Sequence, residues 1–109
     1  MEQKVRELAA RFVREDLESR FGDAFVFDPI LVEQRVDHDG EEYLRVDIVF
    51  DGDQRNLDAG WTSGLVLRLH LKLREHGIDS IPSPHFIKKS EWKEYARAMD
   101  RRKRQVAAS

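Results

Sequence analysis

Apolar residues recur at steps of three and four positions at the start of the chain, which predicts a helix over residues 2–21. The members of this stripe are Val5, Leu8, Ala9, Phe12, Val13, Leu17 and Phe21. That spacing places them on one face of an α-helix. Gly22 follows directly, and because glycine is common just past a helix end, it indicates that the helix stops there.

Two segments with extended patterns follow and predict a β-hairpin. In residues 42–50 the apolar side chains on one face of a half-buried strand are Leu44, Val46, Ile48 and Phe50. Residues 25–36 are extended as well. Within them Pro29 cannot donate to a β-ladder, so it belongs at an edge, a bulge or a strand start. Residues 37–40, with the sequence D-H-D-G, have the composition of the turn between the two strands.

Residues 65–74 fit two patterns. Leucines alternate with other residues, as in a strand, but a helical stripe is also present at Trp61, Leu65, Leu69 and Leu73. We favour the helix because leucine is not β-branched, Asp58 can cap the start and Gly77 can end it. Trp61 would then be a core anchor. Leu67 and Leu71 would lie on a second face and require burial by another chain or by the C-terminal helix.

The remaining elements are an extended segment and a last helix. Residues 78–87 contain two prolines, which suits a connector or a short edge strand. Ser90 is a plausible cap for a final helix, whose short apolar face consists of Trp92, Tyr95, Ala96 and Met99. The order is α-β-β-α-(β)-α, an α+β fold in which helices pack a small antiparallel sheet. We expect a single domain over residues 1–105 and a frayed tail over 106–109.

Composition narrows the class of protein. Of the 109 residues, 37% are charged and 40% hydrophobic, as expected for one soluble globular domain. No apolar run approaches the about 20 residues that cross a bilayer, and the N-terminus lacks a signal-peptide pattern, so we expect a cytoplasmic location. The absence of cysteine excludes disulfides and thiolate chemistry. Charge is uneven: residues 1–60 carry a net −8 and residues 61–109 a net +6.

The candidate chemistry is sparse. Asp51 and Asp53 flank Gly52 and could offer oxygen ligands to a divalent cation, which would suit a metal-dependent enzyme. The other ligands of an EF-hand loop are missing, so turn formation and helix capping explain these aspartates better. Ser63 and Ser90 lie outside complete hydrolase motifs. We therefore predict no catalytic residue, metal or cofactor.

The C-terminal segment combines basic and aromatic residues, as nucleic-acid-binding surfaces do. Its basic members are Lys88, Lys89, Lys93, Arg97, Arg101, Arg102, Lys103 and Arg104, and its aromatic members are Phe86, Trp92 and Tyr95. Core packing and a solvated basic face are the simpler explanation. Because a hairpin with one short extra strand is a marginal sheet, we predict a non-enzymatic protein that acts by protein–protein association. Its partner would be a second copy or another small protein, with Leu67 and Leu71 at the interface.

Overall fold

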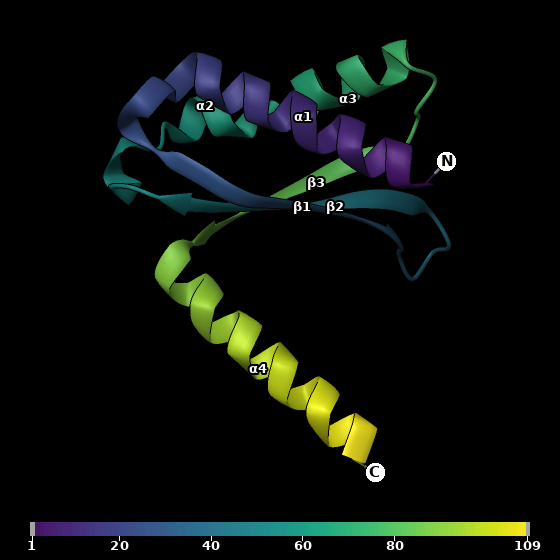
Figure 1. The fold of residues 1–109 in the computed structure, drawn as a ribbon. Coiled ribbons are helices and arrows are strands. Elements are labelled where there is room, and N and C mark those ends of the chain that lie inside the picture. Colours follow the sequence, from purple (N-terminus) through teal and green to yellow (C-terminus); the bar gives the residue numbers. More distant parts are fainter. Residues whose placement is uncertain (1, 109) are drawn as a thin grey trace.

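A computed structural model describes the backbone of residues 2–108 and the side chains of residues 3–98. Its elements are α1 (Glu2–Phe21), the 3-10 helix η1 (Gly22–Ala24), β1 (Val26–Val36), β2 (Glu42–Asp51), the 3-10 helix η2 (Gln54–Asn56), α2 (Ala59–Ser63), α3 (Leu65–Glu75), β3 (Ile81–Lys88) and α4 (Lys89–Ala108). Helices α1, α2 and α3 cover one face of the sheet, whereas α4 leaves from the opposite side (Figure 1). The predicted α+β order is confirmed. The domain boundary at residue 105 stays a prediction.

The sheet is mixed, so the expectation of a purely antiparallel sheet is wrong. Its strand order is β1-β2-β3; β1 pairs with β2 in antiparallel fashion, and β2 pairs with β3 in parallel fashion. The tight turn after β1 reverses the chain. After β2, in contrast, the chain crosses the sheet through α2 and α3 before β3 begins, and such a crossover returns the chain in the same direction. The prolines of β3 lie on an edge strand, as their missing N–H groups require.

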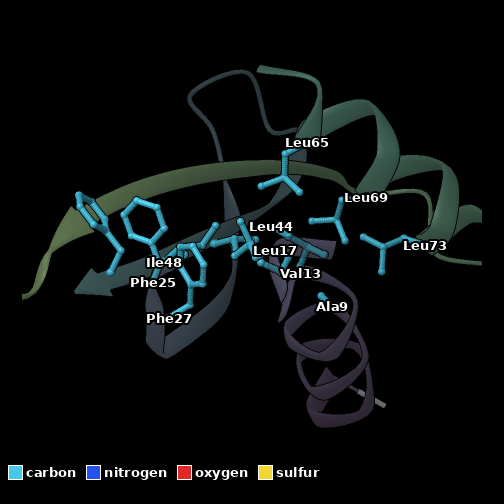
Figure 2. Close-up of a cluster of buried hydrophobic side chains, with 12 residues drawn as sticks. Ala9, Val13, Leu17, Phe25, Phe27, Leu44, Ile48, Leu65, Leu69 and Leu73 are labelled. Carbon is cyan, nitrogen blue, oxygen red and sulfur yellow. The ribbon is translucent and has the colours of Figure 1, made fainter. Parts of the chain in front are cut away.

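The hydrophobic core lies between α1, α3 and the helix-facing side of the sheet. Leu65, Leu69 and Leu73 of α3 are buried, which confirms the helical interpretation of this segment. Figure 2 shows these leucines pointing from α3 toward Val13 and Leu17 of α1. The rest of the buried apolar cluster comprises Ala9, Phe25, Phe27, Leu44, Val46, Ile48 and Phe50. Both predicted apolar patterns, of the first helix and of the central strand, therefore face the core.

The β1 strand bends at an irregularity in its pairing, at the proline where the sequence allowed a bulge. The pairing of β1 with β2 shifts register between Phe27 and Ile30, the interval that contains Pro29. Arg14 of α1 donates a 2.7 Å hydrogen bond to the Phe27 carbonyl at this bend. From Ile30 to Val36 the pairing is regular. The edge strand thus has an irregular first part that α1 contacts and a regular second part.

Trp61 lies at the margin of the core rather than at its centre. Its side chain is only partly buried, and its ring meets the Phe21 ring edge-on at a centroid distance of 5.3 Å. Trp61 thus packs against the core, as the predicted core anchor would, but it does so from the margin and is not fully buried. Trp61 belongs to the short helix α2, whereas the buried leucines belong to α3, which begins at Leu65. Trp61 therefore contacts the core from one end.

Asp58 caps α2 as the sequence predicted, and it also binds Arg20. Its Oδ1 accepts hydrogen bonds from the backbone N–H groups of Gly60 and Trp61 at 3.0 and 3.2 Å. Its Oδ2 accepts one from the Arg20 guanidinium at 3.0 Å. The hydrogen bond from Arg20, followed by the N–H of Trp61, lowers the pKa of Asp58 below its ordinary value. One carboxylate thus joins α2 to the end of α1.

Replacing Asp58 by alanine should lower the melting temperature at neutral pH, because the cap and the Arg20 contact are both lost. A carboxylate with a lowered pKa contributes its full stabilisation above its ordinary pKa of 3.8, and the contribution is lost as the pH falls through the lowered value. The difference in melting temperature between wild type and Asp58→Ala should therefore shrink below pH 3.8. Calorimetry across the acid range measures it, and the exposed Glu18→Ala is the control. A difference that is independent of pH would contradict this role.

Candidate functional site

The outer surface of α3 exposes the two leucines that the sequence assigned to an interface. Leu67 is 62% exposed and Leu71 is 52% exposed. Helix α4 leaves from the other side of the sheet and does not cover them (Figure 1). Burial by the C-terminal helix of the same chain is therefore excluded as an explanation for these leucines. Burial by another chain stays a prediction.

A groove of about 460 Å³ runs between α1 and α3 beside Leu71. Its apolar lining comprises Phe12, Leu65, Leu69 and Leu71. Charged side chains of both signs stand around this lining, with Glu15 and Asp16 on α1 and Arg68, Lys72 and Glu75 on α3. An apolar floor with charged borders is the general form of a surface that receives another apolar element.

Arg68 fixes one wall of this groove. Its Nε donates to Asp16 Oδ2 at 3.0 Å, and its second terminal nitrogen donates to the Trp61 carbonyl, also at 3.0 Å. Its guanidinium carbon lies 4.0 Å from the centroid of the Trp61 ring, a cation–π contact. Gly64 leaves room for this side chain, because a Cβ at that position would lie 2.7 Å from the Arg68 guanidinium. The groove wall is thereby ordered before any ligand binds.

Sequence reasoning did not identify Arg68 or Asp16. The two residues are 52 positions apart and belong to different helices. Each one alone looks like a solvated charge on an amphipathic helix, and no spacing rule connects them. Only the packing of α1 against α3 brings them together.

The basic C-terminal segment is only partly described at the level of side chains. Lys88, Lys93 and Arg97 are exposed, and Tyr95 is 50% exposed. Phe86, in contrast, faces the helical layer and packs against the core, so it is removed from the predicted aromatic surface. Arg101, Arg102, Lys103 and Arg104 lie within α4, but their side chains fall outside the described residues. Figure 1 shows α4 projecting away from the sheet.

The acidic loop after β2 is held by arginine. Asp53 caps η2 through the Arg55 backbone N–H, and its carboxylate also accepts hydrogen bonds from the Arg55 side chain at 2.9 and 3.1 Å. These contacts, the side-chain ones first, lower the pKa of Asp53. Asp51 is exposed at the end of β2. Among residues with described side chains, no three histidine or acidic groups converge as metal ligands would.

A serine and a histidine lie together on the open face of the sheet. Ser83 Oγ is 3.3 Å from His85 Nε2, and Asp47 is the residue opposite His85 on β2. A catalytic triad requires the carboxylate to bind the imidazole. Here Asp47 Oδ1 instead accepts a hydrogen bond from Arg45 at 3.0 Å. The three residues are neighbours without the hydrogen-bond order of a triad.

Comparisons of the chain with protein-family models, with curated proteins and with solved structures return no match. Within the described part of the chain, no helix has the length and apolar character to span a membrane.

Proposed function

We propose that this protein acts by protein–protein association, without catalysis, and that the outer face of α3 with its adjoining groove receives a partner. The observation that carries this proposal is the exposure of Leu67 and Leu71 next to an apolar groove between two helices. Two leucines exposed together offer a gain on association, since burying each side chain is worth about 2 kcal/mol. A contact surface gives them a function.

The partner element that suits this surface is an amphipathic helix. Two packed helices leave a groove between them, and a third helix with apolar residues at three- and four-residue steps fills such a groove. Glu15 and Glu75 border the groove together with Lys72, so the partner helix would carry basic and acidic residues beside its apolar stripe. The anchored side chain of Arg68 reduces the entropy lost on binding.

A photoactivatable cross-linking residue in place of Leu71 should attach to one partner protein in the native cell, whereas the same residue in place of the exposed Glu94 should not. The purified partner should bind wild type at least about tenfold more tightly than it binds Leu67→Lys, since that change buries a charge at the contact. Glu94→Lys is the matched control for added positive charge. Equal binding of wild type and Leu67→Lys would remove this surface from the proposed function.

Nucleic-acid binding is the second candidate, favoured by the projection of α4 away from the sheet with Lys93 and Arg97 exposed. Replacing Arg101, Arg102, Lys103 and Arg104 by alanine tests it. We expect the fourfold variant to fold and associate as wild type does, because charges at a helix end contribute only about 0.3–1 kcal/mol each. Submicromolar wild-type binding to RNA or DNA that falls steeply with salt, and is lost in the variant, would instead identify a nucleic-acid-binding protein.

A further inference from the structure

The outer edge of β1 is the longest unpaired strand edge in the described part of the chain. The sheet order leaves β1 with one neighbour, β2, along its 11 residues. An unpaired edge presents backbone N–H and C=O groups that can pair with another strand. Natural proteins commonly blunt such edges, and β3 is blunted by Pro82 and Pro84, which cannot donate hydrogen bonds.

The two parts of β1 differ in their capacity to pair. At the bend, Pro29 lacks an N–H group and Arg14 already occupies the Phe27 carbonyl. From Ile30 to Val36 the strand is regular, and within the described residues no side chain hydrogen-bonds to its backbone. The usable edge is therefore residues 30–36.

This usable edge is complementary to itself. Its last five residues read V-E-Q-R-V, from Val32 to Val36. Read in the opposite direction, valine again meets valine, and the positions of glutamate and arginine are exchanged. Two copies in antiparallel register centred on Gln34 therefore place Glu33 of each copy opposite Arg35 of the other. Opposite charges in directly facing positions stabilise a strand pair.

Antiparallel pairings centred on other residues near Gln34 are less favourable. Residues that face each other across an antiparallel pair point to the same side of the sheet, so a two-fold axis through the sheet passes through one residue position. An axis at Glu33 or at Arg35 would set that residue against its own copy and bring like charges together. An axis at Val32 would place Pro29, which has no N–H group, opposite Arg35.

The side chains of the paired residues also suit this dimer on both faces of the sheet. Glu33 and Arg35 lie on the open face of the sheet, since their partners on β2 are Arg45 and Tyr43. They form an ion pair of 2.8 Å within the chain and are 60% and 40% exposed, so they can turn toward a second copy. On the helix-facing side, Val36 is 60% exposed and would be covered by Val32 of that copy.

We infer that residues 32–36, the last five residues of the regular edge of β1, pair with the same residues of a second copy to give a two-fold dimer with a continuous six-stranded sheet. This inference rests on the proposed role in protein association but uses a different surface from the outer face of α3. The pairing surface is short, so the dimer forms reversibly and depends on protein concentration.

Sedimentation equilibrium of the full chain should show a monomer–dimer equilibrium. Glu33→Arg should weaken the dimer at least about tenfold, because both symmetry-related contacts become repulsive. The double variant Glu33→Arg/Arg35→Glu exchanges the charges and should return the dissociation constant to within about threefold of wild type. Glu41→Arg, the same charge change outside the usable edge, is the matched control.

Disulfide cross-linking gives a second readout, because the chain contains no cysteine. Gln34→Cys should oxidise to a covalent dimer, since facing residues of an antiparallel pair have Cα atoms about 4.5–5.5 Å apart, within disulfide reach. Val36→Cys should not, because the two copies of residue 36 lie four residues out of register.

The inference is overturned by any of three results: a chain that stays monomeric to millimolar concentration, a double variant no better than Glu33→Arg, or equal cross-linking of both cysteine variants. Leu67→Lys should leave this dimer intact. A dimer lost in Leu67→Lys but kept in Glu33→Arg would overturn the edge pairing while supporting association through α3. A monomeric chain that still binds a partner through Leu67 would overturn the edge pairing alone.

Discussion

Replacing Leu65 by alanine should lower the free energy of unfolding by about 2–5 kcal/mol, because the truncation leaves a cavity among fully buried side chains. Leu65 has no exposed surface and points from α3 into the cluster of Figure 2. Leu67→Ala should change the same quantity by less than about 0.5 kcal/mol in the monomer. The two variants remove the same atoms from one helix, two positions apart. They differ only in the face on which the atoms lie.

Urea denaturation followed by tryptophan fluorescence measures both variants, since Trp61 lies beside α3. The measurement should be made at low protein concentration, where association contributes little. A loss for Leu67→Ala as large as that for Leu65→Ala, at every concentration, would mean that the chain itself buries Leu67. A loss that appears only at high concentration would show that a second copy covers it.

Gly52→Ala should destabilise the protein by about 2–5 kcal/mol through two separate effects. Gly52 follows β2 with φ +154°, a conformation that side chains disfavour. An added Cβ would also lie 2.4 Å from a ring carbon of Phe25, which is buried in the aromatic cluster, and 3.0 Å from the Ala24 carbonyl oxygen. Relieving that overlap requires the ring or the strand end to move, at a further cost.

Gly40→Ala is the matched control for the conformational effect alone. Gly40 has φ +83° in the turn between β1 and β2, and a Cβ there would meet open space. Its substitution should cost about 1–2 kcal/mol. Thermal unfolding by calorimetry, together with near-ultraviolet circular dichroism of the aromatic cluster, compares the two. Equal losses for both variants would show that the Phe25 ring yields to a methyl group without cost.

Elements with strong local patterns were predictable from the sequence. The stripe of α1, the alternation of β2 and the Asp58 cap depend on residues within a few positions of one another, and the structure confirms each, although Asp58 caps the short helix α2 and not α3 itself. The stop signal at Gly77 also matches the observed helix end, where Gly77 adopts φ +77°. Local steric and hydrogen-bonding rules are sufficient for such features.

Features that depend on distant contacts were not predictable. The direction of β3 follows from the path of the chain over the sheet, and its eight residues, with two prolines, carry no signal for parallel pairing. The contact between Arg68 and Asp16 requires that two helices first pack together. The self-complementary stretch V-E-Q-R-V is visible in the sequence, but only the strand order shows that it lies on a free edge.

The direct junction between β3 and α4 sets the direction of the last helix. β3 ends at Lys88 and α4 begins at Lys89, with no loop residue between them. A helix of 20 residues is about 30 Å long, so a change of about 10° at this junction displaces its far end by about 5 Å. One inserted residue would rotate the helix by about 100° and turn the Trp92–Tyr95 pair toward a different side. The backbone torsions at this junction therefore determine the direction in which the whole surface of α4 faces.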